Sequence, residues 1–199
     1  MKNREEMKER ERSVEVRTST THPIRVDWLP VSLPGRIGLT FAPGKKSWSK
    51  YTGGRWERDL DADLQRLQSH FQMDSLVSLI ENEEFGRYEI DGLFARCEAL
   101  GIAVTHFPIR DVSTPRIGAD VATLVRDILQ QANQGKIVVI HCIGGLGRTG
   151  TIAGCLLAEL GVQPADALQT LRKLRGPNCP ETERQRAFIQ NYWGSRWSA

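Results

Sequence analysis

The sequence lacks the features that mark membrane, secreted and nucleic-acid-binding proteins. It has no apolar run long enough to span a membrane, and its opening stretch, MKNREEMKERERS, has no apolar core of the kind found in secretory signals. No basic block is interleaved with aromatic residues, and the net charge of +3 suits anionic substrates without indicating nucleic-acid binding. We therefore expect a cytoplasmic protein that binds neither membranes nor nucleic acids.

Signatures of metal and disulfide sites are also missing. The four cysteines form no CxxC pair, and the four histidines form no HxxxH or HExxH pattern. His141 and Cys142 are neighbours, but a strand would point their side chains to opposite faces, so they are not expected to share a metal ion. Cys97 and Cys155 fall within helical patterns and are predicted to be core residues. We expect no metal and no other cofactor.

The segments that the sequence does contain alternate between strand and helix patterns. Strands are predicted at residues 24–29, 37–41, 76–80, 104–109 and 137–140. Helices are predicted at residues 59–71, 93–100, 121–132, 148–160, 164–174 and 181–193. The last three helices follow one another without a strand between them. This order predicts an α/β fold with a central, mostly parallel sheet flanked by helices and a helical C-terminal cap.

The domain organisation predicted from the sequence is simple. Residues 1–20 are charged and then rich in Ser and Thr, without an apolar stripe, and they predict a mobile N-terminal arm. Residues 21–199 predict a single domain large enough to bury a sizeable core. Residues 43–55 predict a loop that connects the early strands to the first helix.

Two lysines and two tryptophans stand out within that early part of the chain. Lys45 and Lys46 are predicted to be solvated loop residues, with the alternative that they line an entrance and attract an anionic substrate. Trp48 and Trp56 are predicted to pack locally, with the alternative that they contact a ring of the substrate.

The most informative stretch is IVVIHCIGGLGRTGTIAG, residues 137–154. Gly145, Gly147 and Gly150 spell GxGxxG, the dinucleotide-binding pattern, which requires a second strand ending in an acidic residue about 20 positions later. The segment that follows is helical instead, and Asp166 falls at the start of a helix. The context that this pattern needs is therefore missing.

The same stretch also spells Cys-x5-Arg, from Cys142 to Arg148, a pattern typical of cysteine-dependent phosphatases. A tight loop between a strand and a helix turns successive N–H groups inward, and the helix N-terminus adds partial positive charge. Gly144, Gly145 and Gly147 are predicted to supply φ values closed to other residues. The Arg148 guanidinium can grip two phosphate oxygens, and the same donors favour a thiolate at Cys142. The loop that binds the substrate thus activates the nucleophile.

Further residues of this loop complete the candidate phosphate site. His141 is expected to fix the loop by hydrogen bonding, and Thr149 to donate a hydrogen bond to the thiolate when it becomes the leaving group. The backbone N–H groups expected to bind phosphate belong to Ile143, Gly144, Gly145, Leu146 and Gly147.

HCIGGLGRTG, residues 141–150, resembles the signature of the protein-tyrosine phosphatase superfamily in its dual-specificity branch, in the group of the kinase-associated phosphatase and its bacterial relatives. LPG at 33–35, HFPIRD at 106–111 and LRG at 174–176 extend the likeness, which covers roughly residues 24–193. The resemblance implies the cysteine-phosphatase fold.

The resemblance also implies a two-step mechanism through a phosphocysteine intermediate on Cys142. Asp111 matches the acid that protonates the leaving oxygen and then activates water, with Asp120 as the alternative acid. Gln185 matches a glutamine that positions the hydrolytic water. Glu181 stands where the eukaryotic enzyme has glutamine, a departure that leaves the detail of the second step open.

We expect a monomeric hydrolase that acts on phosphotyrosine, and on phosphoserine or phosphothreonine, in phosphorylated proteins. The loop is expected to bind phosphate and not the group attached to it, so inositol phosphates, nucleotides and RNA 5′-phosphates stay open as substrates. A phosphate-binding regulatory module without turnover is the alternative from another class of function.

Overall fold

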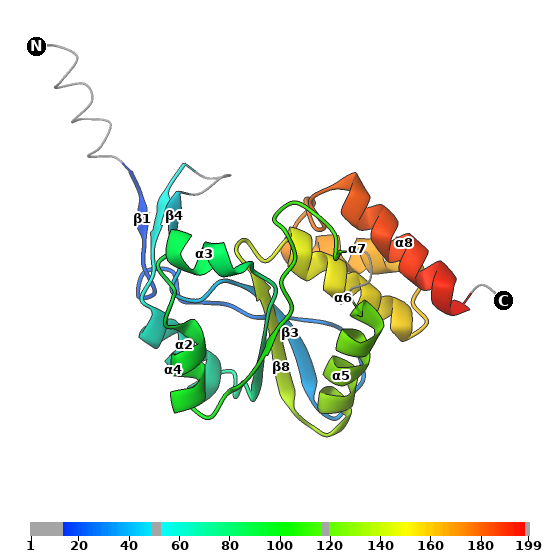
Figure 1. The fold of residues 1–199 in the computed structure, drawn as a ribbon, viewed down its shortest axis with the longest axis horizontal. Coiled ribbons are helices and arrows are strands. Elements are labelled where there is room, and N and C mark those ends of the chain that lie inside the picture. The colour runs from blue at the N-terminus through cyan, green and yellow to red at the C-terminus, as the bar shows by residue number, and fades with distance from the viewer. Residues whose placement is uncertain (1–13, 49–52, 117–119, 198–199) are drawn as a thin grey trace, which may run out of the picture.

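A five-stranded sheet forms the centre of the fold, which a computed structural model describes for residues 14–48, 53–116 and 120–197 (Figure 1). The strand order is β2-β3-β8-β6-β7. The strands are β2 (Asp27–Trp28), β3 (Arg36–Phe41), β8 (Ile137–Cys142), β6 (Ser75–Ser78) and β7 (Ala103–His106). β3, β8, β6 and β7 run parallel, whereas β2 pairs antiparallel with β3 at one edge. The mostly parallel α/β fold predicted from the sequence is thereby confirmed.

Helices cover both faces of this sheet (Figure 1). One side carries α2 (Leu60–Ser69) and α4 (Leu93–Ala99), and the other carries α5 (Val121–Asn133), α6 (Gly147–Glu159), α7 (Pro164–Arg175) and α8 (Glu183–Trp197). Two apolar cores result, one on each face. β8 serves both, because successive side chains of a strand point to opposite faces. Val138 and Ile140 pack in the α5–α8 core, and Val139 packs in the α2–α4 core.

A second, three-stranded sheet of order β1-β5-β4 was not expected from the sequence. β1 (Val16–Arg17) pairs parallel with β5 (Arg55–Glu57), and β5 pairs antiparallel with β4 (Lys46–Trp48). The prediction of a loop over residues 43–55 was therefore wrong at residues 46–48. The strands are two or three residues long, too short for a visible alternation of apolar and polar residues.

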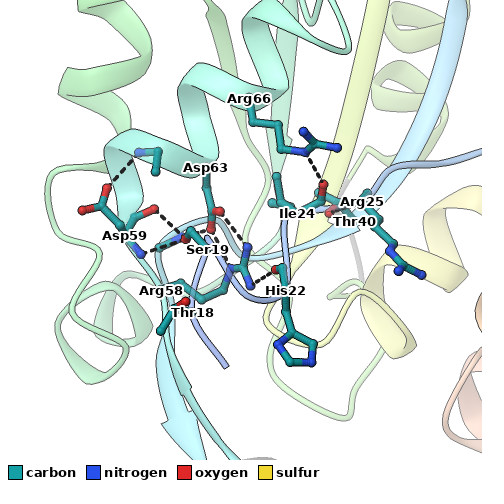
Figure 2. Close-up of polar contacts among 12 residues, drawn as sticks. Thr18, Ser19, His22, Ile24, Arg25, Thr40, Arg58, Asp59, Asp63 and Arg66 are labelled. Atoms are coloured by element: carbon teal, nitrogen blue, oxygen red, sulfur yellow. Dashed lines mark hydrogen bonds and ion pairs between the residues drawn. The ribbon is translucent and has the colours of Figure 1, made fainter. Parts of the chain in front are cut away.

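The chain ahead of β2 is tied to this small sheet and to α2 (Figure 2). The Ser19 hydroxyl accepts a hydrogen bond from the Asp59 N–H at 2.9 Å, and Arg58 donates through Nη1 to the His22 carbonyl at 2.7 Å. The sequence assigned residues 1–20 to an arm. Residues 1–13 lie outside the described part of the chain, and residues 14–20 carry β1 and these contacts.

Some element boundaries differ from prediction for local reasons. β2 covers two residues of the predicted strand 24–29, and β7 ends at His106, two residues before Pro108, which has no N–H to donate to a ladder. The short helix α3 (Asn82–Arg87) was not predicted, although Glu81 and Glu84 form a capping box at its start.

The four parallel strands point their carboxyl ends to the same edge of the sheet, where α/β proteins bind ligands. β3 leads to Lys45, β6 to Glu84, β7 to Asp111, and β8 to Cys142 and Arg148. No helix in the described part of the chain is long and apolar enough to cross a membrane.

Candidate active site

A cavity of about 420 Å³ opens at this edge of the sheet. It is lined by the loop that follows Cys142, by Asp111 and Glu181, and by residues of the small sheet and its flanks. The lining residues are Arg17, Phe41, Lys45, Ser47, Trp48, Trp56, Tyr88, Asp111, Cys142, Ile143, Gly144, Leu146 and Glu181. Among the described residues, no group of three His, Cys, Asp or Glu side chains could hold a metal ion.

The Cys142 sulfur lies at the base of the loop, where the Gly145 N–H donates a hydrogen bond to Sγ at 3.2 Å. Gly145 has a φ of +72°, and an added Cβ would come within 2.4 Å of the Thr40 carbonyl oxygen. The prediction that Gly144 and Gly147 also supply left-handed φ values was wrong. A Cβ on Gly144 would meet nothing within 4 Å. The tight turn thus depends on one glycine, which also brings an amide to the sulfur.

Donors outside the loop hold its carbonyl groups. The Ile143 carbonyl accepts from the Ala42 N–H at 3.2 Å and from Lys45 Nζ at 3.0 Å. Arg175 Nε donates to the Gly145 carbonyl at 3.0 Å. Because the C=O and N–H of a peptide unit point in opposite directions, carbonyls fixed outward turn the following N–H groups inward. The orientation of the loop is thus fixed by donors on other segments.

Arg148 is buried and bound to three acceptors. Its Nη1 and Nη2 donate to the two carboxylate oxygens of Glu84 at 2.5 and 3.0 Å, and Nη1 also donates to the Ile109 carbonyl at 3.1 Å. Nη2 lies 3.0 Å from Oδ1 of Asp111. Burial acts to lower the pKa of Arg148, but the bond to Glu84 and the charges of Cys142, Glu84 and Asp111 outweigh it and raise that pKa. The guanidinium stays charged.

Glu84 was missed in the sequence, which offers little to distinguish it from Glu83 beside it. Only the fold reveals that the Glu84 side chain is 3% exposed and faces Arg148, 64 residues further on. The capping-box pattern from Glu81 was the available signal, but it indicates a helix start and not a contact with the loop.

The two candidate acids occupy different environments. Asp111 lines the cavity and contacts Arg148, with 38% of its side chain exposed. Asp120 instead caps α5, where Oδ1 accepts from the Thr123 N–H at 2.8 Å, and this bonding to Thr123 lowers its pKa. Asp111, and not Asp120, is therefore next to the loop.

His141 and Thr149 are both buried beside the loop. Nδ1 of His141 lies 3.2 Å from the Cys142 carbonyl, and burial lowers the pKa of the imidazole to about 4. The Thr149 hydroxyl has no hydrogen-bond partner among the described residues, so the donation to the sulfur expected from the sequence is not formed in this state. The histidine is held neutral against the loop backbone.

Gln185 and Glu181 take different positions around Gly147. The Gln185 amide is buried, donates to the Ser113 carbonyl at 2.9 Å and accepts from the Thr182 N–H at 3.1 Å. It thereby links α8 to the segment that follows Asp111. Glu181 lines the cavity, and its carboxylate lies close enough to Gly147 that an added Cβ there would come within 2.4 Å of it.

The two neighbouring lysines, Lys45 and Lys46, lie in different environments. Lys46 is 39% exposed and binds Glu89 at 2.8 Å, as expected of a surface lysine. Lys45 is 6% exposed and lines the cavity, so its prediction as a solvated loop residue was wrong. Local packing was predicted for both tryptophans. Trp48 lines the cavity and is 65% exposed. Trp56 also lines the cavity, is half-buried and packs against Phe41.

Comparisons with known proteins agree with this geometry. Residues 57–189 match the family described as Swiss Army Knife protein, DSP-PTPase phosphatase domain. Cyclin-dependent kinase inhibitor 3 of Rattus norvegicus is 30% identical over 175 residues, 85% of this chain and 79% of the relative, and the Homo sapiens protein of that name gives the same values.

Two solved structures extend the comparison. Kinase associated phosphatase, crystallised with its catalytic-site cysteine replaced by serine, superimposes with a TM-score of 0.77 and 27% identity over 89% of this chain and 97% of that one. Tk-PTP in its active form gives a TM-score of 0.61 and 28% identity over 80% of this chain and 92% of its own.

Proposed function

This chain belongs to the DSP-PTPase family and is a cysteine-dependent phosphatase, and we propose that its substrates are phosphorylated proteins, phosphotyrosine above all, cleaved through a phosphocysteine on Cys142. One observation carries the proposal. Cys142, whose sulfur has an amide donor at 3.2 Å, and Asp111 line one cavity that four aromatic side chains also line.

In the first step the phosphate dianion enters the cradle of amides, and the Cys142 thiolate attacks phosphorus. Phosphate oxygens compete with Asp111 for the Nη2 donor of Arg148, because Asp111 Oδ1 lies 3.0 Å from that atom. Binding therefore frees the Asp111 carboxylate from Arg148, and the freed group takes up a proton from solvent beside the bound dianion and passes it to the leaving oxygen as the P–O bond breaks. Glu84 and the Ile109 carbonyl keep the guanidinium in place during this exchange.

In the second step water attacks the phosphocysteine, and the Asp111 carboxylate accepts a proton from it. The sulfur leaves as a thiolate, stabilised by the Gly145 N–H and the α6 N-terminus. Glu181 is the side chain that lines the cavity near the loop, while Gln185 holds the Ser113 carbonyl. Gln185 thus acts on this step by positioning the segment that carries Asp111.

The substrate class follows from the wall of the cavity. Phe41, Trp48, Trp56 and Tyr88 give it four aromatic side chains, which favour a phenyl ring as the group attached to phosphate. The relatives named for kinases make phosphorylated kinase segments natural candidates. Phosphoserine peptides, inositol phosphates, nucleotides and RNA 5′-phosphates provide the comparison substrates.

The first test is hydrolysis of p-nitrophenyl phosphate with reductant and EDTA, comparing wild type with Cys142→Ser. We expect turnover in the wild type and none above background in the variant. In the wild type, mass spectrometry should detect a phosphocysteine. A matched control is Cys97→Ser, a buried core position with a pKa raised to about 12 by burial. Equal rates for wild type and Cys142→Ser would refute the assignment, and a preference for inositol phosphates over phosphotyrosine peptides would refute the substrate class.

The second test concerns the acid. Asp111→Asn is expected to slow hydrolysis of an alkyl phosphate by roughly 10²–10⁴-fold, the usual contribution of a positioned acid. Asp120→Asn is the control, because Asp120 caps α5 outside the lined cavity. If the two substitutions exchanged these effects, Asp120 would be the acid.

We propose a cytoplasmic, monomeric enzyme. The four described cysteines are free thiols, and free thiols persist most readily where the compartment is reducing. Light scattering during gel filtration tests the monomer, and a mass twice that of the 22.4 kDa chain would contradict it.

A further inference from the structure

Lys45 is a buried lysine at the active-site cavity that the mechanism above does not use. It follows β3, is 6% exposed, and donates from Nζ to the Ile143 carbonyl at 3.0 Å. Nζ also lies 4.8 Å from the ring centroid of Phe41 and 5.0 Å from that of Trp56. A hydrogen bond from a side chain 98 residues earlier in the chain thus reaches the carbonyl of the residue that follows the nucleophile.

Burying an ammonium group is costly, and its surroundings indicate what compensates. Burial lowers the pKa of Lys45 to about 8, with Arg58 and Arg175 acting in the same direction. The charges of Cys142 and Asp63 act in the opposite direction, and that of Cys142 is the larger. Near neutral pH the group therefore carries its charge beside the nucleophile.

We propose that Lys45 is a positioning residue of this phosphatase: its ammonium group fixes the Ile143–Gly144 peptide so that the Gly144 N–H faces the phosphate, and its charge holds Cys142 as a thiolate. The first part follows from the hydrogen bond, because a carbonyl pinned outward turns the N–H of the same peptide inward. The second follows from proximity, because the ammonium binds the carbonyl of the residue next to Cys142 and both side chains line one cavity, and a positive charge so placed favours a thiolate over a thiol.

The inference rests on the proposed role of Cys142, but its test does not depend on turnover. The rate of alkylation by iodoacetamide is measured against pH, because only the thiolate reacts. Cys142 is the cysteine that lines the cavity, whereas Cys97 and Cys179 are buried and have pKa values raised to about 12 by burial, and burial raises that of Cys155 further. Peptide mapping of the alkylated protein assigns the signal.

Lys45→Met keeps the length and the apolar stem but removes the charge and the donor. We expect the pH midpoint of Cys142 alkylation to move upward by roughly 1 unit, the lower end of the range for loss of a nearby opposite charge. We expect kcat/KM for p-nitrophenyl phosphate to fall roughly tenfold, because the Ile143 carbonyl then keeps only its bond from the Ala42 N–H and the Gly144 amide is held less firmly. The variant should be at least as stable as wild type, because a buried charge is gone. An unchanged alkylation midpoint would overturn the proposal.

Lys46→Met is the matched control, because Lys46 is the adjacent residue, is 39% exposed and binds Glu89 outside the lined cavity. It should leave the alkylation midpoint and kcat/KM at wild-type values. A change equal to that of Lys45→Met would mean that any lost lysine charge has this effect, and would overturn the proposal.

Lys45→Arg keeps the positive charge and provides a test should Lys45→Met fail to fold. Wild-type kcat/KM should decline above pH 8 as Lys45 loses its proton, whereas the arginine variant should hold its plateau to pH 9. The other charged or titratable groups that face Lys45 or line the same cavity are Arg17, Arg58, Asp63, Tyr88, Asp111, Cys142, Arg175 and Glu181, and both proteins share them. If kcat/KM of wild type and of Lys45→Arg declined in the same way above pH 8, the proposal would be overturned.

Failure of this inference is distinguishable from failure of the proposed function. A wild type that hydrolyses no phosphate monoester refutes the function. A wild type that does, with alkylation profiles that coincide for wild type, Lys45→Met and Lys46→Met, refutes only the role of Lys45.

Discussion

Within the described residues, two arginine–carboxylate pairs are fully buried, one beside the candidate active site and one away from it. Arg58 binds both oxygens of Asp63 at 2.7 Å, and Arg148 binds both oxygens of Glu84 at 2.5 and 3.0 Å. In each pair both side chains are at most 3% exposed. Chemistry and burial are therefore nearly the same in the two places.

The pairs differ in what takes their remaining hydrogen bonds. Arg58 gives its third nitrogen to the His22 carbonyl at 2.7 Å (Figure 2). Asp63 accepts a further bond from the Gly44 N–H at 2.9 Å. All of these partners belong to fixed backbone. Arg148 instead gives a donor to Asp111, a half-exposed side chain that a phosphate can displace. A buried ion pair becomes catalytic when one of its donors faces a replaceable acceptor.

The largest expected effect is a loss of stability when the Arg58–Asp63 pair is broken. Asp63→Asn leaves the Arg58 guanidinium buried without a full counter-charge, which costs about 3–5 kcal/mol in the free energy of unfolding. Urea unfolding measures this, with Asp61→Asn as the control, because its partner Arg96 is half-exposed and such surface pairs contribute about 1 kcal/mol or less. Activity per folded molecule should be retained at low temperature, and its loss would show that the two pairs are not separate in function.

The next effect lies on the catalytic side. Arg148→Lys keeps a positive charge but loses the planar pair of donors, so kcat for p-nitrophenyl phosphate should fall roughly 10²–10³-fold. Arg58→Lys is the matched comparison and should lower stability while leaving kcat within a few fold. If both variants lost turnover to the same degree when fully folded, the contrast between an occupied and a replaceable acceptor would be wrong.

The pH dependence of stability extends the comparison, because a buried histidine, His141, lies next to Cys142 in the chain. The pKa of His141 is lowered by burial from 6.5 to about 4. Between these two values the unfolded chain binds a proton that the folded chain does not, so stability falls as pH falls, by roughly 3 kcal/mol. His141→Asn should flatten the unfolding free energy over this window, whereas exposed His70→Asn should not. Equal slopes in all three proteins would contradict the account.

What the sequence predicts well is local. Cys142 and Arg148 are six positions apart, and the strand and helix on either side hold them in the relation that their spacing implies. β3 and β6 were also predicted, from short apolar runs that the sheet buries on both faces, and α2 and α5 from apolar residues at helical spacing.

What the sequence did not predict depends on contacts between distant segments. Glu84 reaches Arg148 across 64 positions, and Lys45 reaches Ile143 across 98. A charged residue in a polar stretch looks the same whether the fold buries it or leaves it in water. The sequence does not predict β1 for a related reason. Its two residues are too few to show the alternation of a strand, and its pairing depends on β5, 39 positions later.

The wall of the cavity has a consequence for how such enzymes diversify. Arg17, Phe41, Lys45, Ser47, Trp48 and Trp56 all precede residue 57, where the family match begins, whereas Asp111, Cys142, Arg148 and Glu181 all lie inside it. Exchanging the stretch before residue 57 between relatives would therefore replace much of the cavity lining, Lys45 included, while Tyr88, Asp111 and Cys142 stay in place. The substrate preference of such a chimaera would measure how far this leading stretch sets the choice of substrate.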